Sequence, residues 1–375
     1  MPFSGFDHDM MRRALELACK GTGFVSPNPL VGCVITNEVG EILGEGAHLV
    51  YGGPHAEPNA IRDAESKGHP VAGSTVYVTL EPHCHQGKTQ PCTKLLIEKE
   101  ISRCVVAMQD PNANVNGKGI QEMREAGIGV EVGLLEDEAR ELNRFFIKHI
   151  STGQPYVTLK IASSLDGRAA LSSGESKWIT SEESRTVVHR MRAAYDAIIV
   201  GTRTVLLDDP ELTVRLATGR QPYRIVLDAR MELPDTLRLF SDEHRAKTIM
   251  LTKSDAVERN SEKRKLLEER GISIIALDGE SNRIDLKIAL DLLGARRIAS
   301  VLVESGPNLA ASLIKENLFD EMVIFYAPIF LGSDAMTSIG PLDVESISSA
   351  AHLALNQLER VAGTDDILVR LRTGS

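Results

Sequence analysis

Residues 74–92 read STVYVTLEPHCHQGKTQPC, and this stretch decides the fold of the first part of the chain. Its first seven residues form an apolar, β-rich run that predicts a buried strand over 74–80. A loop rich in His and Cys follows, and a helix is predicted over 92–100. Upstream, the tripeptide HAE at 55–57 opens another predicted helix over about 58–67. Side chains able to bind a metal therefore gather at the starts of two predicted helices.

Strand-like and helical segments alternate on both sides of this stretch, which predicts a layered α/β fold. Asp7 is the expected N-cap of the first helix. The predicted strands of this part lie at 30–36, 41–47, 74–80, 103–108 and 129–133. The predicted helices lie at 7–20, 58–67, 92–100, 119–126 and 136–150.

Turn-forming residues at 151–155 follow the last of these helices, and a fresh strand begins at Tyr156. We therefore expect two domains, over 1–150 and 151–375, and the second again alternates strands with helices. Its further strands are predicted near 196–201, 223–228, 247–252, 272–277, 298–304 and 321–327. Its helices are predicted near 181–194, 256–270, 284–293 and 307–317. The tail, 352–359 and 366–372, is predicted to form an antiparallel strand pair.

Composition and charge exclude several classes of protein. A chain that is 42% hydrophobic and 25% charged has the make-up of a globular protein rather than a disordered one. Its net charge of -10 argues against nucleic-acid and membrane partners. The start carries no signal-peptide core, and no apolar run reaches about 18 residues. Five widely spaced cysteines indicate thiols, some of them metal ligands, and a cytoplasmic location.

The His and Cys residues of this region suit a catalytic zinc site. Such a site needs three protein ligands and an open position for water, whose pKa the ion lowers to about 7. Glu57, two residues after His55 at the start of the same helix, can carry protons without binding the metal. Cys92 opens the second helix, where the helix dipole favours a thiolate. The alternative is a structural zinc knuckle without catalysis.

The combination resembles the cytidine-deaminase-like superfamily, whose signature is H-x-E followed by P-C-x-x-C. A longer series of motifs resembles the deaminase half of the bifunctional riboflavin-biosynthesis deaminase/reductase family. In order, these motifs are PNPLVGCVI at 27–35, HAE at 55–57, TLEP and HxGKTxPC. The resemblance implies a cytidine-deaminase-like three-layer domain. It also implies that Asn28 helps to hold the pyrimidine and that Glu57 is the catalytic proton shuttle.

This chain departs from the family pattern at the second zinc ligand. Where the family reads E-P-C-S-H, the chain has His83 at the position of the thiolate. One reading gives a Zn²⁺ site of His55, His83 and Cys92, because imidazole is an ordinary zinc ligand. In a second reading the loop shifts by one residue and Cys84 binds instead. In a third the deaminase half is impaired, which leaves a reductase with a structural deaminase domain.

The second domain carries no G-x-G-x-x-G after a strand, so the dinucleotide fingerprint is absent. The predicted strand 298–304 runs into VESGPNL at 303–309 and a helix. A small-residue turn at a helix N-terminus can bind phosphate, although an ordinary strand-to-helix turn has the same sequence character.

Several segments of this domain resemble, in order, the reductase half of the same bifunctional family. They are KIASSLDGR at 160–168, GESKWIT at 174–180, MRA at 191–193, TVLLDDPELTVR at 204–215 and the VESGP turn. The resemblance implies a dihydrofolate-reductase-like α/β domain that binds NADPH. The implied cofactor contacts are Ala162, Trp178, Thr204, Asp208, Gly306, Pro307, Asn308, Leu309, Ala310, Ala311 and Ser312. The implied substrate contacts are Ser176, Arg192, Leu212, Arg215 and Glu304.

Two of these assignments have a physical rationale of their own. Arg192 and Arg215 are always charged and can hold a ribose phosphate through paired hydrogen bonds. Trp178, the only tryptophan, can flank the nicotinamide, or else it is a core residue. The resemblance thus implies deamination of a diaminopyrimidinone ribosylamine phosphate and NADPH reduction of its ribosyl side chain to ribityl. The resemblance also implies two kinds of partner. One is a small phosphorylated pyrimidine, and the other is further copies of the chain in a homo-oligomer, a dimer or tetramer.

Overall fold

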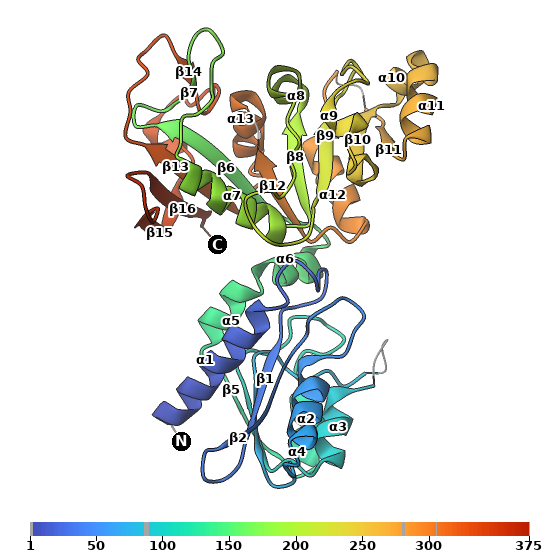
Figure 1. Cartoon of the computed structure of the whole chain (residues 1–375), viewed down its shortest axis with the longest axis vertical. Coiled ribbons are helices and arrows are strands. Elements are labelled where there is room, and N and C mark those ends of the chain that lie inside the picture. The colour runs from blue at the N-terminus through green and yellow to red at the C-terminus, as the bar shows by residue number, and fades with distance from the viewer. Residues whose placement is uncertain (1–2, 86–89, 280–281, 305, 375) are drawn as a thin grey trace. The chain divides into compact units, whose positions relative to one another are not determined.

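The computed structural model describes residues 3–85, 90–279, 282–304 and 306–374 (Figure 1). The chain divides into two compact units, Met1–Gly153 and Gln154–Ser375. The junction falls three residues after the boundary expected from the turn at 151–155. None of the helices in the described part of the chain has the length and apolar character that crossing a membrane requires.

The first unit is a five-stranded sheet in the order β2-β1-β3-β4-β5. β1 runs antiparallel to both β2 and β3, while β3, β4 and β5 are parallel. The strands are β1 (Gly32–Thr36), β2 (Ile42–Ala47), β3 (Thr75–Val78), β4 (Arg103–Val106) and β5 (Gly129–Val132).

Helices cover both faces of this sheet and make it a three-layer unit (Figure 1). The helices are α1 (Gly5–Cys19), α2 (Ala56–Ser66), α3 (Cys92–Glu98), α4 (Lys118–Glu125), α5 (Glu136–Leu142) and α6 (Arg144–Thr152). α1 and α5 lie on one face, and α2, α3 and α4 lie on the other. The expected fold class, a sheet between helical layers, is confirmed for this unit.

Two local predictions for this unit are wrong, both because of hydrogen bonds. The N-cap of α1 is Ser4 rather than Asp7: the Ser4 hydroxyl accepts from Asp7 N at 3.1 Å and the Asp7 carboxylate accepts from Ser4 N at 2.8 Å. The helix predicted over 136–150 is two helices that meet at Asn143. The buried Asn143 amide bonds both backbone groups of Leu30, at 2.8 and 3.0 Å, and this contact fixes the break.

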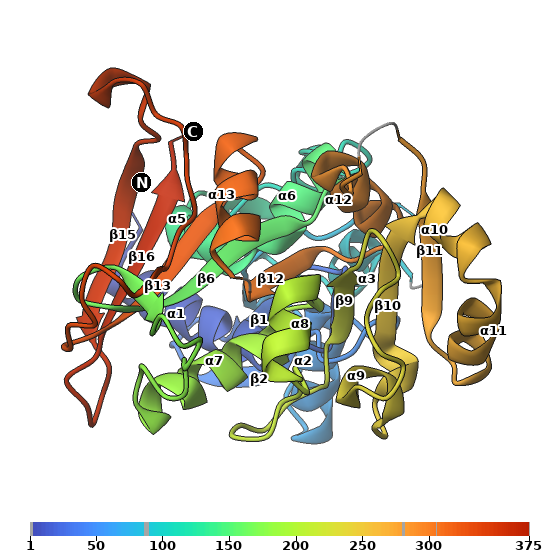
Figure 2. The same ribbon diagram turned by 90° about the horizontal axis from the view of Figure 1, so that it is seen from above.

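The second unit is built on a nine-stranded sheet in the order β11-β10-β9-β8-β12-β6-β13-β16-β15. Figure 2 shows this sheet running from β15 and β16 at one edge to β10 and β11 at the other. Neighbouring strands from β11 to β13 are parallel, and the last two pairs are antiparallel. The strands are β6 (Tyr156–Ser164), β8 (Ala197–Gly201), β9 (Tyr223–Leu227), β10 (Thr248–Lys253), β11 (Ser273–Leu277), β12 (Ser300–Glu304), β13 (Glu321–Ala327), β15 (Leu353–Arg360) and β16 (Ile367–Thr373). The predicted antiparallel pair at the tail is confirmed.

The helices of this unit are α7 (Glu182–Ala194), α8 (Thr202–Asp208), α9 (Arg238–Ser241), α10 (Ser254–Arg259), α11 (Ser261–Glu269), α12 (Leu286–Ala295) and α13 (Pro307–Lys315). The helix predicted over 256–270 is divided into α10 and α11. α8, α9 and the small pair β7 (Arg168–Ala170) with β14 (Met336–Thr337) were not expected. Short 3₁₀ turns lie at Arg245–Lys247 and Ile347–Ser349.

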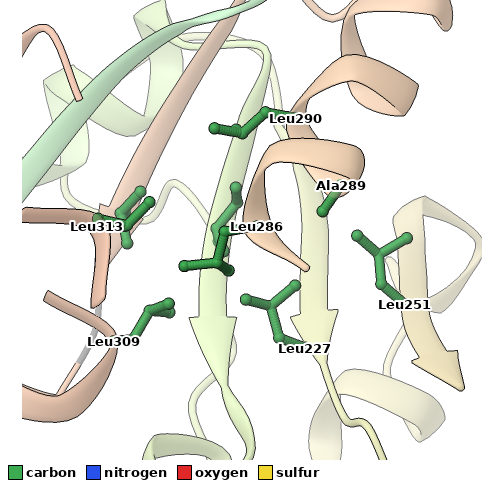
Figure 3. Close-up of a pocket in the computed structure, with 9 residues that line it drawn as sticks. Leu227, Leu251, Leu286, Ala289, Leu290, Leu309 and Leu313 are labelled. Carbon is green, nitrogen blue, oxygen red and sulfur yellow. The ribbon is translucent and has the colours of Figure 1, made fainter. Parts of the chain in front are cut away.

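Side chains of the central parallel strands alternate between two hydrophobic cores. Ile199 of β8 and Ile225 of β9 pack with α12 and α13, whereas Ile198 and Val226 pack with α9, α10 and α11. A cavity of about 10 Å³ inside the first of these cores is lined by aliphatic side chains, including Leu286 (Figure 3). Because that volume holds about one water molecule, the cavity is a packing gap and no ligand site.

Candidate functional site

Three metal-binding side chains of the first unit converge. The ligand atoms of His55, His83 and Cys92 all lie within 4.8 Å of one another. The Sγ atom of Cys92 is 3.6 Å from Nδ1 of His55, and the rings of His55 and His83 have centroids 4.5 Å apart. Two imidazoles and one thiol are a donor set that zinc prefers. Cys84 is not part of this group in the portion of the chain that the structure describes.

The start of α2 brings His55 and Glu57 to the sheet. His55 is the N-cap residue of α2, and Glu57 lies in its first turn. A Cβ at Gly46 of β2 would lie 2.3 Å from the carbonyl oxygen of Ala56, so only glycine allows the helix to approach this closely. The close approach buries Glu57, which is 3% exposed.

The loop between β3 and α3 is held by a buried carboxylate, Glu81. Its Oε1 accepts from the backbone N–H of Gly119 and Ile120, and its Oε2 accepts from those of Asp110 and Gly117, at 2.9 to 3.3 Å. The carbonyl oxygen of His83, two residues later, accepts from Thr93 N at 3.3 Å. Glu81 therefore ties the ligand loop to the segment before α4 and to the first turn of α4. The TLEP motif contains Glu81, but sequence reasoning assigned it no role.

Electrostatics around the group favour neutral imidazoles and a protonatable glutamate. Burial, with His83 and His48 nearby, lowers the pKa of His55 to about 4, so its ring nitrogen keeps a lone pair. Burial raises the pKa of Glu57, and Oε2 of this residue has no hydrogen-bond partner among the described residues. Burial and the neighbouring Glu57 also raise the pKa of Cys92. The sequence suggested that the helix dipole would lower the pKa of Cys92, but burial and Glu57 outweigh that effect. A bound divalent cation would convert this thiol to a thiolate.

Asn28 lies beside this group and contacts a histidine that the sequence analysis did not single out. Its Nδ2 is 3.1 Å from Nε2 of His48, and Nδ1 of His48 is 3.0 Å from the carbonyl oxygen of Pro54. His48 is 2% exposed, and burial lowers the pKa of its ring. No motif contains His48, so the sequence offered no signal for it. The GKT residues of the family motif, 87–89, lie outside the described residues.

In the second unit, Glu304 joins two cations at the end of β12. Nε and Nη2 of Arg192 donate to the two carboxylate oxygens of Glu304 at 2.6 and 2.9 Å, and Lys160 Nζ lies 3.8 Å from Oε2. Burial alone would raise the pKa of Glu304, but Arg192 and Lys160 outweigh it and lower the pKa to about 2. Burial lowers the pKa of Lys160 against the opposing effect of Glu304. Lys160 opens the KIASSLDGR segment, and sequence reasoning gave it no role.

The other expected substrate contacts are spread around this pair. Arg192 also donates to the Thr213 carbonyl oxygen at 3.0 Å, so each of its three nitrogens makes a hydrogen bond within the chain. The side chain of Arg215 is half-exposed and donates to Glu211 at 2.5 Å. Leu212 is buried in the second core, and Ser176 lies in the loop between β7 and α7.

The expected cofactor contacts lie mainly at the carboxyl ends of strands β8 and β12. Gly306 precedes α13, and its N–H donates to Thr204 Oγ1 of α8 at 3.2 Å. Ala310 and Ala311 are buried, and the partly buried Leu309 packs against the core. The remaining positions are Ala162 on β6, Asp208 at the end of α8, and Pro307, Asn308 and Ser312 on α13.

Trp178 is a surface residue, which excludes the alternative of a core tryptophan. It is 67% exposed, and the guanidinium carbon of Arg185 lies 4.3 Å from its ring centroid. An exposed ring of this size in a loop before a helix is available to stack on a planar ligand. The geometry therefore leaves the nicotinamide interpretation open to test.

Comparisons with known proteins match each unit to a separate family. The cytidine and deoxycytidylate deaminase zinc-binding region matches residues 4–108, and the RibD C-terminal domain matches residues 155–368. The riboflavin biosynthesis protein RibD of Aquifex aeolicus is 42% identical over 364 residues, with 97% of each chain covered. That of Escherichia coli K12 is 39% identical over 368 residues, with 95% of this chain and 96% of the relative covered.

Solved structures agree along the whole chain. RibD of Acinetobacter baumannii (form 1) has a TM-score of 0.87 at 37% identity, with 99% of each chain covered. A diaminohydroxyphosphoribosylaminopyrimidine deaminase/5-amino-6-(5-phosphoribosylamino)uracil reductase of Thermotoga maritima has a TM-score of 0.86 at 37% identity, with 98% of this chain and 99% of that chain covered. The chain therefore belongs to the RibD family of riboflavin biosynthesis, bifunctional enzymes that join a zinc-dependent deaminase to an NADPH-dependent reductase.

Proposed function

We propose that the first unit deaminates 2,5-diamino-6-ribosylamino-4(3H)-pyrimidinone 5′-phosphate and that the second reduces the ribosylamino side chain of the product to give 5-amino-6-ribitylaminouracil 5′-phosphate. The observation that carries this proposal is the convergence of His55, His83 and Cys92 next to the buried Glu57. The domain roles follow: deaminase over 1–150 and reductase over 151–375.

Zinc would be held by His55, His83 and Cys92 and not by Cys84. Support comes from the 4.8 Å grouping of the three ligand atoms, which leaves out Cys84 among the described residues. Zn²⁺ bound there supplies a Lewis acid that activates water for attack on the amino-bearing ring carbon. Burial lowers the pKa of His55, which keeps its ring a neutral donor.

Glu57 would move the protons of the deamination. Burial raises the pKa of its carboxyl group above the ordinary value, which favours a role as proton carrier. It would take one proton from the attacking water and pass it to the ring nitrogen. It would then take the second proton from the hydroxyl newly formed on the ring carbon and give it to the amino group, which leaves as ammonia while the hydroxyl becomes a carbonyl. Asn28 would hold the pyrimidine beside this carboxylate.

In the second unit the residues orient substrate and cofactor rather than supply a nucleophile. NADPH would supply the reducing equivalent, and the backbone N–H groups of Asn308 and Leu309 in the first turn of α13 would be the donors to its phosphates. Lys160 and Glu304, 3.8 Å apart, are the pair that would face the ribosyl side chain, and Arg192 holds Glu304 in place. Arg215, whose side chain is half-exposed, would bind the substrate phosphate.

Assembly and location belong to the same proposal. The sheet of the second unit ends at β15, whose Leu355 and Leu358 are each 62% exposed, and such an edge supports a homo-oligomer, a dimer or tetramer. The described cysteines are free thiols, which supports a reducing, cytoplasmic compartment. The substrate is a small phosphorylated pyrimidine.

One experiment tests the proposal. Zinc content, ammonia release and NADPH oxidation are measured on the purified chain and on the neighbouring variants His83→Ala and Cys84→Ala. We expect His83→Ala to lose zinc and ammonia release while it still oxidises NADPH with the deaminated substrate, and Cys84→Ala to keep all three. If Cys84→Ala lost zinc and His83→Ala kept it, the loop would bind the metal through the Cys84 thiol. Zinc binding by the unmodified chain without ammonia release would favour a reductase with a structural deaminase domain.

A further inference from the structure

His48 is a buried imidazole with two specific hydrogen-bond partners and no part in the chemistry described above. It follows β2 and is 2% exposed. On one side its Nδ1 lies 3.0 Å from the carbonyl oxygen of Pro54, and on the other its Nε2 lies 3.1 Å from Nδ2 of Asn28. A buried imidazole bonded through both nitrogens has a fixed orientation.

The two partners decide which ring nitrogen of His48 carries the proton. A carbonyl oxygen can only accept, so Nδ1 must donate to Pro54. Both partners are neutral, and no carboxylate hydrogen-bonds to the ring among the described residues. A neutral imidazole has one N–H, so Nε2 carries the lone pair and needs a donor. Of the two ends of the Asn28 amide, only Nδ2 can donate.

The tautomer of His48 therefore sets the direction of the Asn28 amide. With Nδ2 turned to His48, Oδ1 points away from the imidazole, and it has no hydrogen-bond partner among the described residues. An oxygen in that position accepts from an N–H group of a ligand and repels a carbonyl. If the amide were rotated by 180°, Nδ2 would face the ligand and would select a hydrogen-bond acceptor instead of an N–H group.

We infer that His48 is a positioning residue of the deaminase unit: as its Nδ1–H tautomer it holds Asn28 with Oδ1 facing the substrate, so that Asn28 reads an N–H donor of the pyrimidine. The inference rests on the proposed role of Asn28 at the deaminase site. His48 acts through Asn28 and touches no reacting atom.

The same imidazole connects the base-binding residue with the metal-binding segment. Pro54, which accepts from His48, directly precedes His55, and the rings of His48 and His55 are edge to face with centroids 5.2 Å apart. Asn59 donates to the carbonyl oxygen of Ala47, the residue before His48, at 2.8 Å. His48 thus fixes the distance between Asn28 and the start of α2, where the proposed ligand and proton carrier lie.

A double-mutant cycle tests this role through ammonia release. His48→Phe keeps a flat ring and removes both hydrogen bonds, and Asn28→Ala removes the amide. We expect His48→Phe to raise the KM of deamination about tenfold, with a smaller change in kcat and with zinc retained. In the double variant we expect no further loss beyond Asn28→Ala, because His48 acts only through that amide. Additive losses would overturn the inference, since they would mean that His48 meets the substrate itself.

A matched control and a direct reading of the tautomer complete the test. His69→Phe removes a histidine of the same unit whose Nδ1 also lies 3.0 Å from a carbonyl oxygen, that of Leu43, but which has no hydrogen bond to an asparagine among the described residues. This variant should leave the KM unchanged. In the unmodified chain with ¹⁵N-labelled histidine, the ring signals of His48, assigned through their through-space contacts with the side-chain amide of Asn28, should be those of an Nδ1–H imidazole. A proton on Nε2 would overturn the inference even if the variants failed to fold.

The two measurements also separate this inference from the proposed function. If the unmodified chain released no ammonia, the proposed deaminase activity would fail, while the tautomer would still be read by NMR. NADPH oxidation with deaminated substrate, measured on every variant, reports whether the second unit remains intact. A wrong tautomer with normal ammonia release would reject the inference alone.

Discussion

Two buried glutamates, Glu57 and Glu304, have pKa values shifted in opposite directions by their surroundings. Burial by itself raises the pKa of a carboxyl group. For Glu57 no cation among the described residues opposes that effect, and its pKa is raised. For Glu304 the charges of Arg192 and Lys160 outweigh burial, and its pKa falls to about 2. One residue is therefore suited to moving protons and the other to remaining a fixed anion.

Replacing Glu57 tests the proton-carrying role. We expect Glu57→Gln to lower ammonia release by about 10²- to 10⁴-fold, because an amide cannot accept and release the protons of the reaction. Zinc content and NADPH oxidation should stay as in the unmodified chain. Glu65→Gln is the control, since Glu65 lies on the same helix, half-exposed and paired with Lys99. Ammonia release that persisted in Glu57→Gln would remove the proton shuttle from the proposal.

Glu304 predicts a specific dependence of stability on pH. Its folded-state pKa lies below the unfolded-state value of about 4.3, so the ionised group stabilises the folded chain above that pH. This stabilisation is lost as the pH falls from about 4.3 towards 2. We expect Glu304→Gln to reduce the fall in the free energy of unfolding over that window. We also expect it to destabilise the chain near neutral pH by about 3–5 kcal/mol, because Arg192 is left buried without its counter-ion.

Urea unfolding followed by circular dichroism at several pH values measures both effects. Glu243→Gln serves as the control, because that side chain is 87% exposed and should change neither quantity. An unchanged pH dependence in Glu304→Gln would show that the Arg192–Glu304 pair contributes little to folding.

At the scale of elements, the loop between β3 and α3 is positioned by residues distant in the sequence. Glu81 binds four backbone N–H groups from residues 110–120, and Thr93 binds the carbonyl oxygen of His83. α4 approaches the loop so closely that a Cβ on Gly119 would lie 2.1 Å from the carbonyl oxygen of Pro82. The place of His83 therefore depends on α4 as much as on its own loop.

A single methyl group at Gly119 should disturb the zinc site. We expect Gly119→Ala to weaken zinc binding by about 10- to 100-fold, because the added carbon displaces Pro82 and with it the neighbouring His83. The measurement is competition for zinc against a chelator of known affinity. Gly129→Ala of β5 is the control, since its Cβ would meet only the Ser102 carbonyl oxygen at 3.6 Å, an ordinary contact. Equal zinc affinity in both variants would contradict the coupling of α4 to the ligand loop.

Prediction of elements succeeded where a segment is long and periodic and failed where tertiary contacts intervene. The central strands of both sheets were predicted to within a few residues, because each is a short apolar run that is visible in its own sequence. The break at Asn143 was not, because it depends on the backbone of Leu30, 113 residues away. The pair β7 and β14 was missed for the same reason: each strand is short and exists only through its partner.

At the scale of the whole molecule, the two units carry separate chemistry, so removal of the metal should divide the activities. We expect treatment with a zinc chelator to abolish ammonia release and to leave NADPH oxidation with the deaminated substrate unchanged, because no residue of the proposed metal group belongs to the second unit. Added zinc should restore deamination. Loss of both activities on chelation would show that zinc also supports the reductase.

The sequence by itself determined the α/β class, the two-part organisation and the residue types of the deaminase chemistry, since periodicity and short motifs are local properties. The tertiary structure decided which side chains meet. It brought His83, and not Cys84, to His55 and Cys92 among the described residues, and it joined His48 to Asn28. It also paired Arg192 with Glu304. These arrangements depend on hydrogen bonds and close packing between residues far apart in the chain, which no local pattern records.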